Sequence, residues 1–434
     1  MSTQIVLPNA PVAAPVPSHG PLTVEANFKI ASVDRQLELK PSSELFHLEV
    51  TKALQAAKQE APLGVLDSFR GTFAGSGFNV IWRPKPQKGG PDFTTPVNIN
   101  ALTKKNLIDD NVLELNLTKE KLQFFDDLNQ VPNRGLFNQP DIVLNGVPYN
   151  QSIENVTNPK TGLADLPTLI GQSNAIHFEP GLWMHVPASV NPPLDATLSR
   201  MASIPHGTTL NAQGKAPTRG SALKGQPPSF PPVDITPFDR DRFRFPGQDA
   251  ATKDSSRLPQ NLSPFIQSGT ITQKILDDPN EVLRAANQGK KFIDTETFTV
   301  STSPAASDFP TSRAGISNIS FLAPNADAVE MTSTFWVSTV QHQLEVPKWN
   351  PKLQGDLILA PSPPSPKADV PIFRLTLKGP ILKEKTVTVF SKQIQYSQTV
   401  MLKFGGITWP HVSVATLVPA DVLNVPDTIL DSLK

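Results

Sequence analysis

Proline is the residue that most restricts what this chain can fold into. It accounts for 45 of the 434 residues, about twice its usual share of roughly 5%. Its ring fixes the φ angle and it lacks a backbone N–H, so helix interiors and central strands exclude it. The sequence therefore predicts mostly strands and loops. Helices are predicted only at Ser42–Gln59 and at Asp278–Gln288, the second capped by Asp278.

Strands are predicted where apolar residues alternate with polar or small ones. Leu113–Leu117 alternates strictly, as a half-buried strand does. Residues 69–82 mix large apolar side chains with glycines, which inside a strand mark a bulge, a bend or a close backbone approach. Asn145-Gly146 between apolar residues predicts a hairpin tip. Further strands are predicted at Thr295–Thr302, Ile316–Leu322, Val329–Val340, Ile372–Leu377, Lys385–Phe390, Gln393–Leu402 and His411–Val418.

Charge and cysteine content exclude several classes of protein. Lysine plus arginine equals aspartate plus glutamate at 39 each, and without a basic cluster no nucleic-acid partner is predicted. Cysteine is absent, which excludes disulfides and thiolate chemistry and fits a reducing compartment. The N-terminus has no secretory pattern, and no stretch approaches the ~20 apolar residues of a membrane span. We therefore expect a soluble cytoplasmic protein without a membrane partner; the oligomeric state stays open.

Composition divides the chain into four parts. Residues 1–22 are rich in proline, alanine and valine and are predicted to be a disordered tail. Residues 23–212 are predicted to form the first part of a β-barrel. Residues 213–261 shift to glycine, proline, serine, arginine and aspartate, which is typical of an insertion or linker. Residues 262–434 are predicted to complete the barrel or to form a second one.

Common catalytic motifs are absent, and histidines are the remaining candidates. There is no nucleophile elbow, P-loop or His-Glu-x-x-His motif, so hydrolase, kinase and dehydrogenase functions have no support. His177, His206 and His411 lie in or beside apolar segments. Glu179 is two residues after His177, so both side chains share one face of a strand. A carboxylate there would raise the imidazole pKa and hold its tautomer, which makes the pair a candidate catalytic unit.

The only two tyrosines occur in the same pattern, Tyr149-Asn150-Gln151-Ser152 and Tyr396-Ser397-Gln398-Thr399. Each precedes a histidine-bearing strand, the first leading to His177 and the second to His411. The order in which these segments occur along the chain resembles that of nitrobindin, a heme-binding β-barrel family related to lipocalins and fatty-acid-binding proteins. The matching pieces are Gly71–Gly77, Val147–Gln151, Ile176–Trp183, Ala202–Gly207, Gln395–Met401 and Pro410–Leu417.

The resemblance implies a fold, a cofactor and a set of site residues. It implies a mainly β protein: an antiparallel lipocalin-like barrel with a large β-rich elaboration and few helices. Its cofactor would be heme b, with the iron bound by His411 and with His177 and Glu179 as catalytic residues. Three residues separate His411 from Ala415 where the family pattern has two, and a one-residue shift in a strand moves side chains to the opposite face unless a bulge absorbs it. The residues expected to line the cofactor are Tyr149, Trp183, Tyr396 and Trp409.

An open sixth iron position would let such a protein act on small oxidants or nitrogen oxides. The activities implied are nitric oxide binding, peroxynitrite isomerisation or a weak peroxidase-like reaction. The alternative is a heme-free lipocalin-like barrel that binds or transforms a hydrophobic metabolite. A third alternative is a structural or interaction β-sandwich without a small ligand, which an interior filled by side chains would support. In it the tryptophans form wall or core, and the histidines are half-buried polar residues.

Overall fold

A computed structural model gives the fold of most of the chain, which divides into the units Met1–Gln59 and Glu60–Lys434. All described residues belong to the second unit. The tail predicted at 1–22 and the helix predicted at Ser42–Gln59 lie outside the described residues. The described residues are 62–84, 111–135, 141–167, 174–191, 193–218, 221–238, 263–309, 312–322, 326–365, 368–404 and 407–433.

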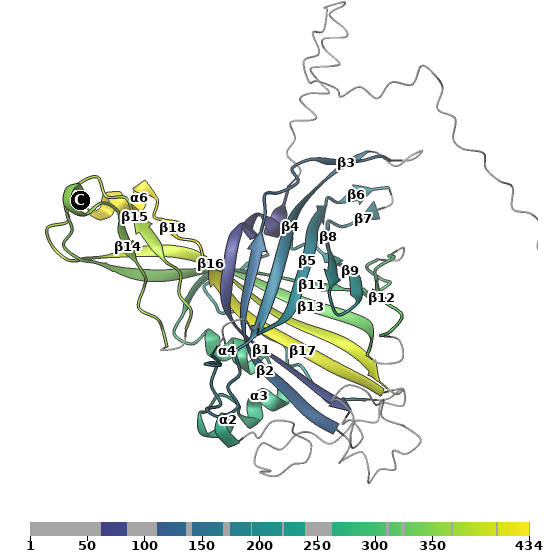
Figure 1. The fold of residues 1–434 in the computed structure, drawn as a ribbon. Helices are drawn as coiled ribbons and strands as arrows, with labels where there is room; N and C mark the ends of the chain where they lie inside the picture. Colours follow the sequence, from purple (N-terminus) through teal and green to yellow (C-terminus); the bar gives the residue numbers. More distant parts are fainter. Residues whose placement is uncertain are drawn as a thin grey trace, which may run out of the picture. The chain divides into compact units, whose positions relative to one another are not determined.

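Ten strands close into one antiparallel barrel (Figure 1). In order around the ring they are β11 (Lys291–Ser301), β13 (Asp327–Val346), β16 (Lys385–Phe404), β17 (Ile407–Pro419), β1 (Gly71–Pro84), β2 (Asn111–Phe124), β4 (Ile142–Asn155), β5 (Ala175–Val186), β8 (Thr197–Ile204) and β9 (Thr208–Lys215). The ring closes where Gln213 of β9 lies opposite Ser301 of β11. Both halves of the sequence therefore contribute strands to one sheet, and the prediction of a mainly β barrel is confirmed.

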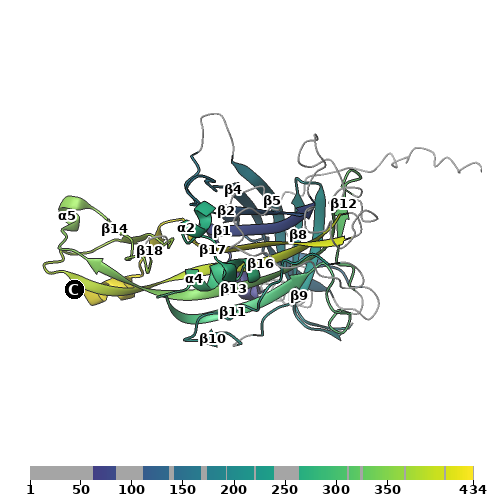
Figure 2. The same ribbon diagram turned by 90° about the horizontal axis from the view of Figure 1, so that it is seen from below.

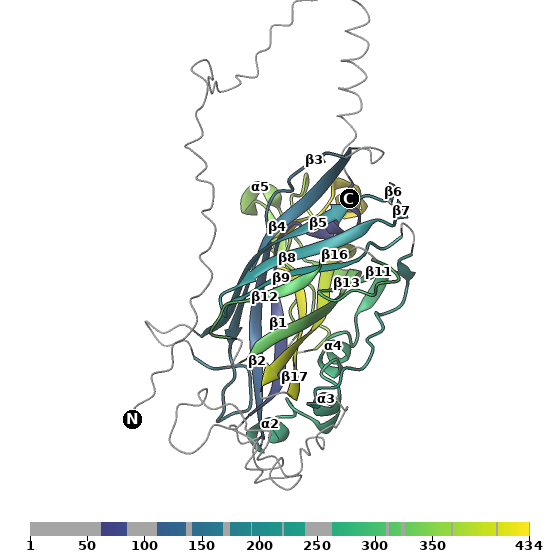
Figure 3. The ribbon, with the colours of Figure 1, turned by 90° about the vertical axis from the view of Figure 1, so that its right-hand side faces the viewer.

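Short strands extend the sheet outside the ring. They are β3 (Val131–Asn133) beside β4, β10 (Leu223–Lys224) beside β11, and β12 (Gly315–Asn318) beside β9. The strands β6 (Ser189–Val190) and β7 (Pro193–Leu194) form a two-stranded sheet of their own. Figure 3 shows β4, β5, β8 and β9 side by side with β12 at their edge. A single 3₁₀ turn, η1 (Gly64–Ser68), precedes β1.

Alternation along the strands separates two cores, as a period of two requires. On β1, Phe73 belongs to a cluster inside the barrel, whereas Phe78 and Val80 belong to a second cluster on the outer face. The lumen cluster also receives Leu66 and Phe69 from the η1 end. The lumen is thus occupied by large buried side chains drawn from nearly every strand of the ring.

Three short helices cover the outer cluster: α2 (Ser263–Gln267), α3 (Gln273–Asp277) and α4 (Glu281–Ala286). Figure 2 shows α4 against β16 and β17. The observed α4 is shorter than the predicted helix. The Asp278 carboxylate instead accepts hydrogen bonds from the backbone N–H of Asn280 and of Val233, which fixes the preceding turn. In the described part of the chain, no helix has the length and apolarity to cross a membrane.

The far ends of β13 and β16 pair with each other and support a small lobe. It contains a three-stranded sheet of β14 (Leu357–Leu359), β15 (Phe373–Leu375) and β18 (Leu423–Asn424), with helices α5 (Pro351–Gln354) and α6 (Asp427–Leu430). A third apolar cluster, including Leu344 and Val387, forms its core. The two strands predicted at 385–390 and 393–402 are one continuous strand of 20 residues.

The hairpin predicted at Asn145-Gly146 is wrong. β4 runs straight through both residues and pairs with β5. A Cβ on Gly146 would lie 2.6 Å from the backbone oxygen of Trp183, so the glycine is needed because β5 approaches closely. The Asn145 side chain donates to Asp127 and accepts from the Gly146 N–H, instead of turning the chain. Strand pairing here overrides a strong local turn signal.

Candidate functional site

The two tyrosine motifs meet inside the barrel. Tyr149 lies on β4 and Tyr396 on β16, which are not neighbours in the sheet. Gln151 of the first motif donates from Nε2 to the Tyr396 hydroxyl across 3.0 Å. Gln398 of the second motif accepts at 2.7 Å from Nη1 of Arg200, on β8. Both bonds therefore cross the lumen and join strands on different sides of the ring.

Arg200 and Glu179 form an ion pair inside this network. Their side chains are 3% and 0% exposed, and Arg200 Nη2 lies 2.6 Å from Glu179 Oε1. The same oxygen accepts from the Tyr149 hydroxyl and, at 3.2 Å, from Arg200 Nε. The guanidinium also lies 5.9 Å from the ring centres of Tyr149 and Trp183. Every polar group of the pair is thus supplied with a partner, which a buried ion pair requires.

The environment of Glu179 keeps it ionised. Burial alone would raise its pKa, but the charge of Arg200 and hydrogen bonds from His177 and Tyr149 outweigh burial and lower the pKa to about 2. The His177 ring nitrogen Nε2 lies 3.2 Å from Glu179 Oε2. The predicted pairing of His177 with Glu179 is therefore present in the geometry, and Arg200 and Tyr149 hold its carboxylate in place.

The pKa of a second carboxyl group, Glu120 on β2, is shifted in the opposite direction to that of Glu179. Its Oε2 accepts from the Tyr396 hydroxyl at 2.5 Å and from Gln151 Nε2 at 3.2 Å, and its Oε1 accepts from Thr118 at 3.0 Å. Among the described residues no lysine or arginine forms an ion pair with it. Burial therefore raises its pKa, although these hydrogen bonds and the charge of His177 oppose the shift. The lumen thus holds one carboxyl that is readily protonated and one that stays charged. Such a split is common in acid–base sites.

Two glycines make room for these groups. A Cβ on Gly77 would lie 2.3 Å from Glu120 Oε1, and a Cβ on Gly181 would lie 2.5 Å from the Tyr149 ring. Of the three reasons considered for glycines in residues 69–82, a close approach is the one that applies at Gly77. Neither position accepts a larger residue without moving a buried hydrogen-bonded partner.

The three candidate histidines converge at the end of the lumen where β5 and β17 begin. The rings of His177 and His206 are 5.8 Å apart. His411 lies opposite Ile81 and Val400, and it shares the inward face of β17 with Ala415. Burial, together with the charges of His177 and His206, lowers the pKa of His411 to about 4. Its imidazole is therefore neutral near pH 7.

These histidines are not arranged for a bare metal ion. Within the described residues, no three histidine or acidic side chains are grouped so that they hold an ion together. A heme needs only one imidazole from the protein on its proximal side. The donor chemistry at this end, a neutral His411 beside His177, fits that requirement.

The middle of the lumen is filled. Tyr149, Trp183 and Tyr396 surround a cavity of about 10 Å³, which is no larger than one water needs. Both tyrosine hydroxyls are hydrogen-bonded to carboxylates. These three residues are core in this structure, so a heme does not fit between them. Trp409 is fully buried in the outer cluster, away from the lumen cluster.

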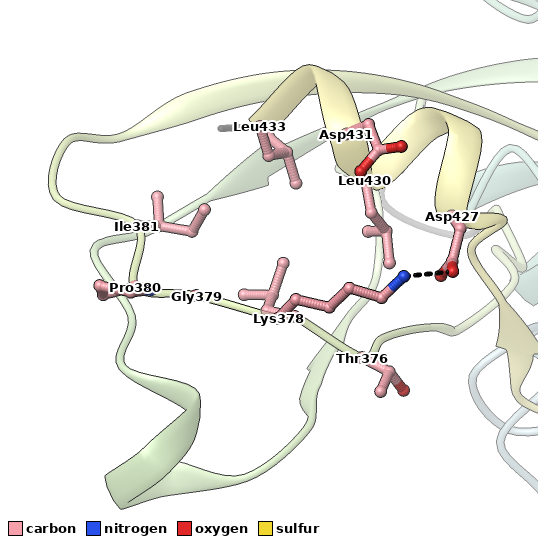
Figure 4. Close-up of a pocket in the computed structure, with 10 residues that line it drawn as sticks. Thr376, Lys378, Gly379, Pro380, Ile381, Asp427, Leu430, Asp431 and Leu433 are labelled. Carbon is pink, nitrogen blue, oxygen red and sulfur yellow. Dashed lines mark hydrogen bonds and ion pairs between the residues drawn. The ribbon is translucent and has the colours of Figure 1, made fainter.

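The small lobe offers a weaker candidate (Figure 4). Its cavity of about 70 Å³ is lined by Ile381, Leu430 and the exposed ion pair of Lys378 with Asp427, whose charged atoms are 2.6 Å apart. That ion pair is exposed, so burial neither holds nor shifts its charges. We therefore assign the candidate site to the lumen, where the titratable side chains are buried and hydrogen-bonded to one another.

Sequence reasoning missed Glu120 and Arg200. Each is a charged residue within a strand, and charged side chains of strands usually face the solvent. A weak signal was present: Arg200 falls on the same alternation as Leu198 and Ala202, both of which are buried. Glu120 likewise alternates with Leu122.

Replacing Glu120 with glutamine is expected to stabilise the protein at neutral pH. Because its folded pKa is raised, Glu120 contributes stability that is complete below its ordinary pKa of 4.5 and is lost as the pH rises through the folded value. Glutamine keeps the shape without that loss. Urea denaturation at about pH 4 and about pH 7 checks this, with exposed Glu154→Gln on β4 as the control. An equal loss of stability at both pH values contradicts the prediction.

Comparison with known proteins adds little. No family model matches the chain, and no curated protein matches it. The crystal structure of Rv2717c from M. tuberculosis matches with a TM-score of 0.27 and 9% identity, over 85% of this chain and 98% of that one. A similarity this low carries no argument about function. The candidate site therefore stands on its own geometry: a closed antiparallel barrel with two tyrosine–carboxyl networks and three histidines at one end.

Proposed function

We propose that this chain is a nitrobindin-like heme-binding barrel in which His411, at the histidine end of the lumen, would bind the heme iron. The observation that carries the proposal is the convergence of His177, His206 and His411, with His411 neutral near pH 7. Metal coordination requires an imidazole without a competing proton. A histidine whose pKa is about 4 meets that condition over the whole physiological range.

The residues of the chain have distinct roles in this proposal. His411 holds the cofactor. His177 faces the same end and holds or transfers a proton at Nε2, where Glu179 fixes its orientation. Arg200 and Tyr149 keep Glu179 charged and immobile. When bound, heme supplies an iron with an open sixth position, at which nitric oxide or a small oxidant would bind.

Titration of the purified chain with hemin tests the proposal. We expect a shifted Soret band that saturates near one heme per chain, and affinity reduced at least about ten-fold in His411→Ala because its iron ligand is lost. His342→Ala is the matched control, since that imidazole lies on β13 away from the lumen. The absence of a Soret shift, or an identical titration with His411→Ala, would overturn the assignment.

A colourless protein that retains an apolar compound through purification would favour the alternative function, a heme-free barrel for a hydrophobic metabolite. The same His411→Ala variant separates the two functions. Its effect on a metabolite held by apolar contacts should be small.

A further inference from the structure

A second cavity lies outside the barrel, between β13, β16 and the segments 361–365 and 368–370. Its volume is about 410 Å³, within the range of ligand sites. Its apolar wall is formed by Pro361, Pro364 and Val340. Its titratable groups include Lys290 and His342. The lumen site uses none of these residues.

Lys290 is the unusual member of this cavity. It is half-buried, and its Nζ donates to Gln393 Oε1 at 2.6 Å. Gln393 is itself buried and fixed, because its Nε2 donates to Asn287 Oδ1 at 3.1 Å. Burial lowers the pKa of Lys290 to about 8, although the charge of Asp369 opposes the shift. A substantial fraction of this amine is therefore unprotonated near neutral pH.

A second pair of polar groups lines the same cavity. His342 Nε2 lies 2.9 Å from the Ser391 hydroxyl. Burial, together with the charge of Lys290, lowers the pKa of His342 to about 4. Its imidazole is therefore neutral and able to accept a proton. The cavity thus combines an amine nucleophile, a neutral base and a hydroxyl, the groups that amine–carbonyl chemistry uses.

We propose that this cavity binds a small uncharged aldehyde or ketone, which Lys290 captures as an imine. The Nζ lone pair forms a bond to the carbonyl carbon, and the C=O π pair moves to oxygen. A proton passes from nitrogen to that oxygen, which gives a carbinolamine. Loss of the hydroxyl with a second nitrogen proton, as water, leaves the C=N bond. One carbonyl and one amine therefore give one imine and one water, with no change of oxidation state.

The lining of the cavity defines the class of substrate. Its titratable side chains are Lys290, Lys291, His342, Glu345 and Asp369. Two lysines face two carboxylates and a neutral imidazole, so the site has no strong preference for an ionic ligand. The proline and valine walls favour an apolar body. A single-ring aromatic aldehyde matches this chemistry.

Reductive trapping on the intact wild-type chain tests the proposal. The protein is incubated near pH 7 with benzaldehyde and cyanoborohydride, which reduces an imine to a stable secondary amine, and labelled lysines are mapped by mass spectrometry. Lys160, which is exposed in the turn after β4 and does not line the cavity, is the internal control. We expect Lys290 to be labelled at least about ten-fold faster, because far more of its amine is neutral than in an ordinary lysine.

Two further readouts make the result decisive. Labelling of Lys290 should saturate with benzaldehyde concentration, because binding precedes reaction, while labelling of Lys160 stays linear. The rate should rise with pH to a half-maximum near the pKa of about 8. Equal rates at the two lysines, or fast labelling that does not saturate, would overturn the carbonyl site. Lys290→Met should remove the fast label. A fast label that persists in that variant would also overturn the carbonyl site.

Discussion

Replacement of Glu179 by leucine is expected to lower the free energy of unfolding by about 3–5 kcal/mol, because it leaves the Arg200 charge buried without its partner. Glu179 is fully buried and accepts hydrogen bonds from Arg200, Tyr149 and His177. Loss of this carboxylate therefore also leaves Tyr149 and His177 without an acceptor. Urea denaturation at pH near 7 measures the change.

The double variant Glu179→Leu with Arg200→Met separates charge burial from simple packing. Removing both charges should recover at least about half of the loss, because apolar pairs often replace buried ion pairs without cost. Asp427→Ala is the control, since its ion pair with Lys378 is exposed and contributes little. A double variant as unstable as the single one would show that the packing of Glu179, rather than its charge, is what matters.

The same pair predicts the acid behaviour of the wild type. Because the folded pKa of Glu179 is about 2 and its ordinary value is 4.5, its contribution is complete above about pH 4.5 and is lost as the pH falls toward 2. The double variant lacks this carboxylate. Its stability should therefore fall less steeply over that interval.

The face of each strand was predictable only where the sequence carried a clear alternation. Tyr149 and Gln151 are two residues apart, so a shared face follows from the strand period alone. Their partners do not follow from it. Tyr396 bonds to Glu120 from 276 positions away, and that contact exists because the ring closes. The placement of His177 and His411 at one end of the lumen likewise depends on how the ten strands close into a ring, which no local pattern encodes.

Local signals also failed where strand pairing overrode them. Asn145-Gly146 has strong turn chemistry, yet the close approach of β5 uses the same glycine within a straight strand. Glu120 and Arg200 have the residue types of solvent-facing positions. They are buried because hydrogen-bonding partners from distant strands compensate for their desolvation, and those partners are visible only in three dimensions.

Trp183→Ala is expected to destabilise the barrel by about 3–5 kcal/mol, the usual cost of removing a fully buried large aromatic side chain. Trp183 is 1% exposed and has edge-to-face contacts with Phe69, Phe298 and Phe335, at centroid distances of 5.8, 5.7 and 5.2 Å. It therefore links the η1 end of the lumen to the β11–β13 wall. Urea denaturation measures the loss.

Trp349→Ala is the matched control, because that ring is only partly buried in the small lobe and its Nε1 donates to the Gly355 carbonyl. Its loss should be clearly smaller. The cavity beside Trp183 has room for little more than one water, so the rings around it are already closely packed. They cannot move into the space that Trp183→Ala would leave without breaking the bonds to Arg200. If Trp183→Ala is no more destabilising than the control, the lumen is not a rigid packed core. The mid-barrel space would then be available to a ligand, and the proposal that heme binds at the histidine end would lose its basis.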